Sequence, residues 1–328
     1  MKKLLHMKTK ITIAISIGDP AGIGPEITFK ALQSDSLRRE ADWLVVGDRA
    51  AFAKLSPHLA DALANLPGVK LREPGILTDQ FTLGQISEEC GRAAVAYVRE
   101  ATELCLRGEA HAMVTAPLNK EAVRLFDGSF TGHTDYIAEL CKVTGARMML
   151  AGPAMRVLHV TTHCSLRKAC ESKSERILDT IRLGDSALRQ LGYKERKIAV
   201  CGLNPHASEH GAFGDEEQRQ IEPAIAMARS EGINCEGPVP ADTVFLKASK
   251  GGYDLVVAMY HDQGHIPMKL LAFETTVNVS LGLPIIRTSV DHGTAFDIAG
   301  KSLASAENMT AAMQLALTLV RGRNAARL

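Results

Sequence analysis

Short apolar runs alternate with amphipathic stretches along most of the chain, and this alternation restricts the possible folds more than any other feature. Each run is rich in aliphatic and β-branched residues and is bounded by turn-forming residues, as buried strands are. Strands separated by helices are typical of mostly parallel sheets with helices on both faces. We therefore predict an α/β fold. The predicted strands are residues 11–17, 43–46, 112–115, 148–150, 157–161, 198–202, 255–259 and 277–281.

Four stretches between or after the predicted strands are predicted to be helices. In the last stretch, Met309, Met313, Leu317 and Val320 recur with a period near 3.6, and Ser305 is a candidate N-cap. The predicted helices are residues 88–106, 172–191, 215–228 and 306–321.

The length of the chain predicts two domains. A chain of 328 residues is too long for one ordinary hydrophobic core. We expect a first α/β domain formed by residues 1–130 together with about 265–328, and a second α/β domain formed by residues 131–264.

Composition excludes several classes of function. Hydrophobic residues make up 46% and charged residues 23% of the chain, and the formal net charge is +1. This balance provides no basic surface for nucleic acid or for an anionic membrane. No apolar run reaches the ~18 residues that would span a bilayer. The 7 cysteines are odd in number and include no Cys-x-x-Cys pair, which argues against a disulfide framework and predicts a cytoplasmic location.

Three of the predicted strands lead directly to a histidine, namely His163, His206 and His261. Ligands of open α/β sheets bind just beyond the carboxyl ends of the strands. Three imidazoles with one open position are typical of a catalytic metal site. Imidazole donors favour zinc, cobalt, nickel or iron(II) over magnesium, although substrate oxygens could shift this preference. A lone histidine at a strand end is more often a hydrogen-bonded loop residue, so the prediction depends on the three occurring together.

Four other histidines are expected to play lesser roles. His159 falls inside a predicted strand and should be a core residue. His210, His265 and His292 are expected in loops near the proposed site, either solvated or supporting the metal ligands through hydrogen bonds.

A second group of residues has the chemistry of an anion clamp. His133 and Thr134 precede an apolar helix and could bind a phosphate or carboxylate at its N-terminus, although Thr134 could instead simply cap that helix. Lys269, Asn278 and Arg287 add two cations and a neutral donor, although such cations are usually surface residues.

Two acidic residues near the histidines are candidate proton carriers. Asp242 could accept a proton, or it could cap a helix over residues 243–248. Asp262 could also move a proton, or it could orient the neighbouring His261. The loop at residues 18–26 contains three glycines between a strand and a helix, so it is either an anion-binding loop or a tight turn.

Six segments together resemble the 4-hydroxythreonine-4-phosphate dehydrogenase family of pyridoxal phosphate biosynthesis. They occur in the family's order and extend over nearly the whole chain. The segments are residues 18–26, 131–134, 202–207, 240–243, 259–264 and 281–294.

The resemblance implies a two-domain fold like that of isocitrate and isopropylmalate dehydrogenases. It also implies a homodimer whose active site lies in the cleft and at the dimer interface, with residues from both subunits. The implied metal ligands are His163, His206 and His261, and the implied substrate contacts are His133, Thr134, Lys269, Asn278 and Arg287.

The implied activity is NAD(P)-dependent oxidation of a phosphorylated 3-hydroxy acid, followed by decarboxylation. The implied cofactors are a divalent metal (zinc, cobalt, manganese or magnesium) and either NAD or NADP. The biosynthetic branch converts 4-hydroxy-L-threonine 4-phosphate to 3-amino-2-oxopropyl phosphate. A second branch, in four-carbon sugar acid catabolism, converts D-threonate or D-erythronate 4-phosphate to dihydroxyacetone phosphate. Ser208, His210 and His265 depart from the pattern of the biosynthetic branch, and residues 115–120 and 162–167 resemble the second branch more closely.

Two other functions fit the residues themselves. A metallohydrolase could use the same three histidines to generate hydroxide at neutral pH. A non-catalytic ligand-binding protein could also share the scaffold. The residues that bind the nicotinamide cofactor are not identified by any motif in the sequence.

Overall fold

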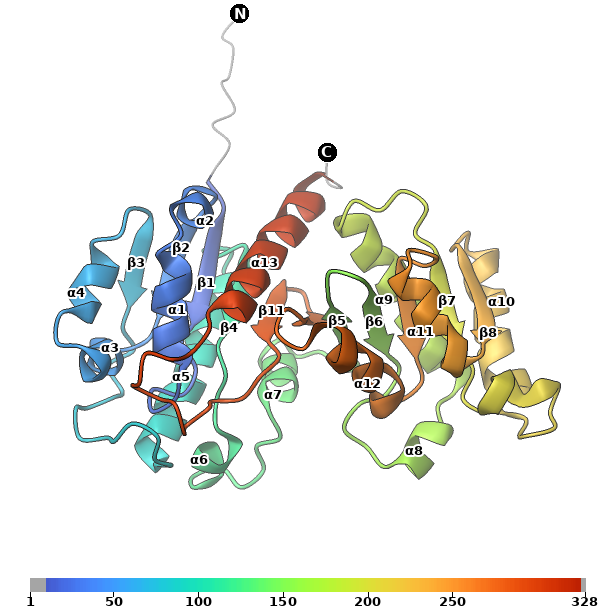
Figure 1. Ribbon diagram of the computed structural model, residues 1–328, viewed down its shortest axis with the longest axis horizontal. Helices are drawn as coiled ribbons and strands as arrows, with labels where there is room; N and C mark the ends of the chain where they lie inside the picture. Colours follow the sequence, from blue (N-terminus) through green and yellow to red (C-terminus); the bar gives the residue numbers. More distant parts are fainter. Residues whose placement is uncertain (1–9, 326–328) are drawn as a thin grey trace, which may run out of the picture. The chain divides into compact units, whose positions relative to one another are not determined.

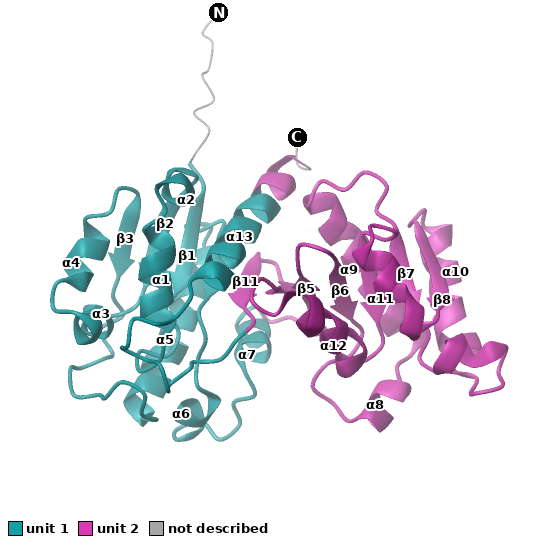
Figure 2. Ribbon diagram, in the orientation of Figure 1, with its two compact units in different colours: residues 1–141, 292–320 teal, residues 142–291, 321–328 magenta. Residues whose placement is uncertain are grey.

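The computed structural model describes residues 10–325, which form two compact units (Figures 1 and 2). Unit 1 takes the chain up to Cys141 and His292–Val320, and unit 2 takes Lys142–Asp291 and the chain from Arg321 on. The unit boundaries therefore lie later in the chain than positions 130 and 265. No helix within the described part is both long and apolar enough to cross a membrane.

Unit 1 contains a parallel sheet in the order β3-β2-β1-β4. Its strands are β1 (Thr12–Ser16), β2 (Asp42–Val46), β3 (Val69–Arg72) and β4 (Ala112–Thr115). Its helices are α1 (Gly24–Leu32), α2 (Asp35–Arg39), α3 (Arg49–Leu55), α4 (Leu59–Ala64), α5 (Glu88–Leu106), α6 (Lys120–Arg124), α7 (His133–Leu140) and most of α13 (Glu307–Ala325).

Helix α5 shows how local sequence sets a boundary and a buried face. Ser87 accepts a hydrogen bond from the backbone N–H of Cys90, and two glutamates occupy the first turn, where the helix dipole favours negative charge. Ala94, Tyr97 and Ala101 lie on the buried face of the helix, which packs against β1, β2 and β4. The sequence predicted both ends of this helix correctly.

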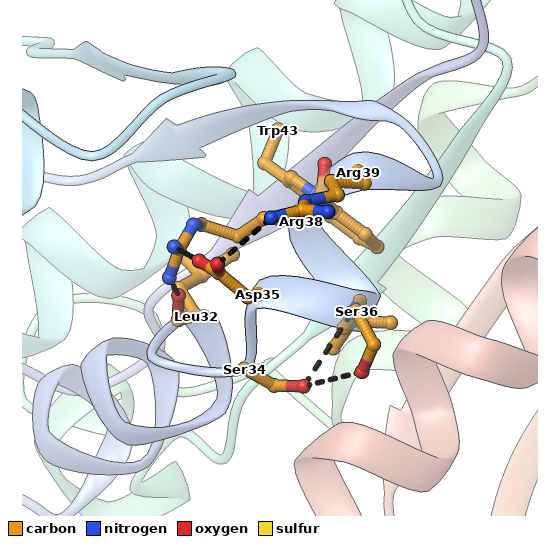
Figure 3. A network of polar contacts seen from close by, with 8 residues as sticks. Leu32, Ser34, Asp35, Ser36, Arg38, Arg39 and Trp43 are labelled. Carbon is orange, nitrogen blue, oxygen red and sulfur yellow. Dashed lines mark hydrogen bonds and ion pairs between the residues drawn. The ribbon is translucent and has the colours of Figure 1, made fainter.

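A polar network supports the short helix α2 and the start of β2 (Figure 3). The Arg38 guanidinium donates to the carbonyl of Leu32 at 2.6 Å and pairs with Asp35. The indole N–H of the buried Trp43 donates to the Arg38 carbonyl at 3.3 Å. These bonds satisfy one carbonyl at the C-terminal end of α1 and one near the C-terminal end of α2, where the last carbonyls of a helix have no partner within it.

Unit 2 contains a mixed sheet in the order β11-β10-β5-β6-β9-β7-β8. Strands β6, β9, β7 and β8 are parallel, whereas β10 is antiparallel to β11 and β5, and β5 is antiparallel to β6. The strands are β5 (Arg147–Ala151), β6 (Arg156–His159), β7 (Ile198–Cys201), β8 (Cys235–Val239), β9 (Leu255–Ala258), β10 (Val277–Leu281) and β11 (Arg287–Val290). The helices are α8 (Leu166–Cys170), α9 (Ser174–Gln190), α10 (Glu222–Ser230), α11 (Ala241–Ser249) and α12 (His261–Ala272), with a 3₁₀ turn η1 (Pro205–Glu209) and a π-helical turn η2 (Glu217–Ile221).

Both faces of the unit 2 sheet are covered (Figure 1). On one face, Leu158 and Leu255 approach Gly184 of α9. On the other, Val157 and Val256 belong to a buried cluster that includes residues of α11 and α12. Because side chains alternate along a strand, strands buried on both faces read as continuous apolar runs, and this explains why the sequence revealed them.

All eight predicted strands are present to within one or two residues, and three further strands, β3, β8 and β11, were missed. The expected helix at 215–228 is in the structure a π-helical turn followed by α10, which extends to Ser230. Helix α12 was not predicted because Gly264 and Pro267 are poor helix formers. His265 therefore lies in a helix and not in the expected loop.

Candidate active site

The three predicted metal ligands follow three strands that are neighbours in the sheet of unit 2. Strands β6, β9 and β7 are adjacent and parallel, so their carboxyl ends share one edge. His163 follows β6, His261 is the first residue of α12 after β9, and His206 lies in η1 after β7. The sequence predicted the strand ends, and the structure adds that the strands are adjacent.

Two of the three imidazole rings lie close to each other, and the third is not grouped with them. The ring centroids of His163 and His261 lie 6.0 Å apart. Two imidazoles bound to one cation at metal–nitrogen distances of about 2.1 Å have ring centroids roughly 5–6 Å apart. The His206 ring lies instead 6.3 Å from that of Phe213. Among residues 10–325, no three His, Cys, Asp or Glu side chains form a group that could hold a metal ion as they stand.

Two of the histidines are held by neighbouring carboxylates. The His206 Nδ1–H donates to Glu209 at 2.6 Å, and the His261 Nδ1–H donates to Asp262 at 2.7 Å. The bond to Glu209 also raises the pKa of His206. Each carboxylate leaves Nε2 of its ring to face a ligand, an arrangement that is common around metal-binding histidines. The bond to Asp262 is the contact that an orienting role would need, and whether Asp262 orients His261 or moves a proton stays a prediction. Glu209 was not identified from the sequence.

The turn that carries His206 is left-handed. His206 and the four residues that follow it all have positive φ angles, and none of them is glycine. Left-handed backbone costs roughly 1–2 kcal/mol for each such residue. Outliers of this kind persist only where surrounding contacts hold them, and they are frequent at functional sites.

Glu217 is one of the contacts that hold this turn. Its carboxylate is fully buried and accepts hydrogen bonds from the backbone N–H groups of Leu203 and Asn204, both at 2.7 Å. It also accepts a bond from the Asn204 side chain at 2.9 Å. Glu217 begins the π-helical turn η2, an irregularity that recurs at functional sites.

Gln263 ties together the two strand ends that lead to His206 and His261. The buried Gln263 side chain donates to the carbonyl of Gly202, just after β7, at 2.8 Å. It accepts a bond from the N–H of Met259, just after β9, at 2.7 Å. One side chain therefore satisfies a backbone group at each strand end and fixes the spacing between them.

Three imidazoles are in contact between the core and the sheet edge. His159 is fully buried at the end of β6, as predicted for a core residue, and its Nε2 lies 3.1 Å from Nδ1 of His265. The His265 ring stacks on that of His261 at a centroid distance of 3.6 Å. Burial lowers the pKa of His159 to about 4 and that of His265 to about 3. Both rings are therefore neutral at physiological pH.

Gly264 allows this contact. A Cβ atom at position 264 would lie 2.4 Å from Nε2 of His159 and 2.7 Å from Cγ1 of Val157. Any larger residue would push α12 away from β6 and separate His265 from His159.

Two of the predicted substrate contacts lie on the sheet face that α12 covers. Asn278 and Ser280 are two residues apart on β10, so their side chains lie on the same face of the sheet. Ser280 is opposite both Arg287 of β11 and Met148 of β5, which places Arg287 on that face as well. Met148 belongs to the cluster that packs beneath α11 and α12. Arg287 is buried, and desolvation lowers its pKa to about 9. The Oδ1 atom of Asn278 is also buried and has no hydrogen-bond partner in the described structure.

Lys269, the third predicted substrate contact in unit 2, is in the last turn of α12. Its ammonium pairs with the carboxylate of Asp291 at 2.5 Å and donates to the Asp291 backbone carbonyl at 2.8 Å. Asp291 was not identified from the sequence.

Two predicted capping roles are wrong. Helix α11 begins at Ala241, so Asp242 lies inside its first turn and does not cap it. Asp242 is exposed and close enough to His206 to influence its pKa. Helix α7 begins at His133 after Gly132, so Thr134 is also inside the helix and not its cap. His133 and Thr134 belong to unit 1, and their role as substrate contacts stays a prediction.

The glycine-containing loop at residues 18–26 also lies in unit 1. Gly18 has a φ of +71°, and a Cβ there would lie 2.1 Å from the Pro117 carbonyl oxygen, so the turn needs glycine. The backbone N–H of Ile23 donates to the carbonyl of Thr294 at 3.0 Å, and Glu26 accepts a bond from the N–H of Ala304 at 3.0 Å. The loop is therefore built against the segment that precedes α13.

Comparison with known proteins identifies the family. Residues 33–316 match the family model described as pyridoxal phosphate biosynthetic protein PdxA. The chain belongs to the PdxA family. It is 45% identical to a D-threonate 4-phosphate dehydrogenase of Salmonella typhimurium, over 95% of this chain and 100% of that protein. PdxA relatives bear the names of dehydrogenases, and the protein is accordingly an oxidoreductase.

Solved structures agree with this assignment. A 4-hydroxythreonine-4-phosphate dehydrogenase from Klebsiella pneumoniae superposes with a TM-score of 0.84 at 41% identity, covering 95% of this chain and 98% of that one. An isocitrate dehydrogenase from Methylococcus capsulatus has a TM-score of 0.52 at 16% identity, covering 97% and 88%, and shows a likeness of fold alone. The predicted isocitrate dehydrogenase-like fold is confirmed.

Proposed function

We propose that the protein oxidises the 3-hydroxyl of a four-carbon sugar acid 4-phosphate, with D-threonate 4-phosphate as the first candidate. NAD(P)⁺ accepts the hydride, and the β-keto acid that forms loses CO₂. The observation that carries this proposal is the set of three adjacent parallel strands, β6, β9 and β7, each followed by a histidine at the same sheet edge. The 45% identity to a D-threonate 4-phosphate dehydrogenase supports the choice of substrate.

His163, His206 and His261 are proposed to hold one divalent cation. The donor set suits zinc or cobalt, and the 6.0 Å separation of the His163 and His261 rings fits two ligands of one ion. The His206 side chain is 60% exposed, so packing does not oppose its rotation toward the other two. Such a cation would polarise the substrate oxygen in both the oxidation and the decarboxylation.

Two acidic residues of the chain would orient a metal ligand and accept the proton of the reacting hydroxyl. Asp262 holds Nδ1 of His261, which leaves Nε2 directed toward the bound ion. Asp242 is exposed and lies near His206, so it is placed to accept the proton of the reacting hydroxyl. We assign the base role to Asp242 because its carboxylate is not engaged by a histidine.

Arg287, Lys269 and Asn278 are proposed to bind the anionic groups of the substrate. Desolvation disfavours the buried Arg287 cation, and a phosphate beside it would restore a favourable environment. The buried Oδ1 atom of Asn278 requires a donor, which a substrate hydroxyl would supply. Lys269 can exchange Asp291 for a phosphate oxygen, since both are anionic acceptors.

We further propose that a second copy of the chain covers part of α12. Ile266, Leu270 and Phe273 of this region are 56%, 80% and 61% exposed, and they follow a helical spacing. Exposed apolar groups that recur on one helix mark an interaction surface. Light scattering of the wild-type protein should give twice the mass of one chain, and Leu270→Glu should lower the fraction of dimer. A monomeric wild-type protein would contradict this part of the proposal.

The test of the function is a substrate comparison with and without chelator. D-Threonate 4-phosphate, D-erythronate 4-phosphate and 4-hydroxy-L-threonine 4-phosphate would each be incubated with NAD⁺ or NADP⁺. We expect reduced nicotinamide to form fastest with a sugar acid phosphate, and metal removal to abolish the reaction. Absence of reduced nicotinamide with all three substrates in the presence of metal would reject the proposal.

A further inference from the structure

A cavity of about 500 Å³ lies in unit 2, at the edge of the sheet opposite the three histidines. Of the residues that line it, Arg196 is two residues before β7, and Gly232 lies between α10 and β8. The cavity is therefore at the amino ends of these two parallel strands, whereas the predicted metal ligands follow carboxyl ends. Its charged lining consists of four arginines and two acids, namely Arg182, Arg189, Arg196, Arg323, Asp185 and Glu231.

Asp185 holds two of these arginines together. Its buried carboxylate accepts a hydrogen bond from Nε of Arg196 at 2.6 Å. The second oxygen of the same carboxylate accepts a bond from Nη2 of Arg189 at 3.1 Å. Because one carboxylate can balance only one guanidinium group, this pair of arginines keeps an excess of positive charge at the cavity.

Arg196 has an unusual backbone conformation. Its φ is +47°, in the left-handed region that is costly for any residue other than glycine. Such conformations persist where surrounding contacts hold them, and they are frequent at ligand-binding positions. The bond to Asp185 and a second bond, from Nη1 to the Lys194 carbonyl at 3.0 Å, are contacts of this kind. The guanidinium group is thus fixed before any ligand binds, which lowers the entropy cost of binding.

Several N–H groups of this pair are not used within the protein. A guanidinium group has five N–H donors. Among residues 10–325, Nε and Nη1 of Arg189 and Nη2 of Arg196 have no hydrogen-bond partner. Arg182, in contrast, is engaged by Glu231 and Asp179 through all three of its nitrogens. Planar donors that are anchored by a shared carboxylate and keep N–H groups to spare are suited to the oxygens of a phosphate group.

We propose that this cavity binds the phosphate group of a small phosphorylated molecule, with Arg189 and Arg196 as its principal contacts. The site takes no part in the proposed reaction, so the inference does not depend on the proposed function. The cavity volume is within the roughly 300–1,000 Å³ of small-molecule sites, which favours an organic phosphate over phosphate alone. The alternative is that these arginines only balance the partial negative charge at the C-terminal ends of α9 and α10, which requires no ligand.

Calorimetry at pH 8 and low ionic strength separates the two. Glucose 6-phosphate and inorganic phosphate are the probes, because both are doubly charged at this pH and only the first carries an organic body. They would be titrated into wild-type protein, Arg189→Gln and Arg196→Gln. The Arg189 side chain is 62% exposed, so its replacement should leave the fold intact. Arg39→Gln is the matched control, since Arg39 is an exposed arginine of unit 1 that also pairs with an aspartate four residues earlier.

Wild-type protein and Arg39→Gln should show a glucose 6-phosphate site whose affinity falls at least about 10-fold in Arg189→Gln and in Arg196→Gln. Oxidation of D-threonate 4-phosphate should be unchanged in both variants, because the cavity is at the other edge of the sheet. Weaker binding of inorganic phosphate would support an organic ligand, and equal binding would overturn that choice. The same number and affinity of sites in wild-type protein and both variants would overturn the inference and leave the proposed function intact. Absence of turnover in a wild-type protein that has the site would overturn the proposed function alone.

Discussion

Asp19 offers a quantitative test of the electrostatics of unit 1. Its side chain is fully buried in the loop after β1, where one oxygen accepts a bond from the N–H of Ala21 at 2.9 Å. The other oxygen is buried without a hydrogen-bond partner in the described structure. Desolvation raises the pKa of Asp19 from 3.8 to about 6, and backbone hydrogen bonds only partly oppose this effect.

The sign of the effect follows from linkage. A carboxyl whose folded pKa is raised binds its proton more tightly in the folded state, so the free energy of unfolding falls as pH rises toward 6. The raised pKa of Asp19 should reduce that free energy, relative to its value at low pH, by about 3 kcal/mol at pH 8 and by about 1.5 kcal/mol at pH 5. Asp19→Asn should therefore stabilise the protein, and more so at pH 8.

Urea unfolding at pH 5 and pH 8 measures this difference. Because the new amide also lacks a buried partner, we expect a net gain of about 1–2 kcal/mol at pH 8 and little gain at pH 5. Asp48→Asn is the matched control, since Asp48 accepts bonds from three backbone N–H groups and from Tyr97 and should lose stability at both pH values. A destabilised Asp19→Asn variant, or a gain that is the same at both pH values, would refute the reasoning.

Three further predictions concern unit 2. Gln263→Leu should leave the Gly202 carbonyl and the Met259 N–H unpaired, and it should therefore weaken zinc binding about 10-fold or more in a competition assay. Unchanged zinc affinity would show that Gln263 does not position the ligands. Gly264→Ala should lower the free energy of unfolding, measured by thermal unfolding, by about 1–3 kcal/mol. Gly128→Ala is the control and should be nearly neutral, because a Cβ there has open space around it. Equal effects of the two substitutions would contradict the close approach at Gly264. Arg287→Lys should raise KM for the phosphorylated substrate about 10-fold with a smaller change in kcat, and unchanged kinetics would remove Arg287 from the site.

The sequence was sufficient to predict the strands whose burial produces continuous aliphatic runs. It could not reveal β8, because Pro238 and Gly237 interrupt the apolar pattern there. It could not give the order of the strands either. The adjacency of β6, β9 and β7 depends on long-range pairing, which no local pattern encodes.

For the site, histidines at strand ends were visible in the sequence, but their supporting residues were not. Glu217 and Gln263 act through backbone groups far away in the chain, and an isolated glutamate or glutamine carries no sign of such a role. His265 was misplaced in a loop because the helix that contains it begins with weak helix formers. The sequence could not show that Asp242 lies inside α11 and does not cap it, because the start of α11 depends on where the unpredicted strand β8 ends.

Metal binding by the wild-type protein and by three single-histidine variants tests the central claim most directly. Zinc content and affinity would be measured for His163→Ala, His206→Ala and His261→Ala, with His58→Ala as control. We expect one zinc per chain in the wild-type protein and the control, and a loss of affinity of at least about 100-fold in each of the three variants. Wild-type stoichiometry and affinity in all three variants would contradict the account.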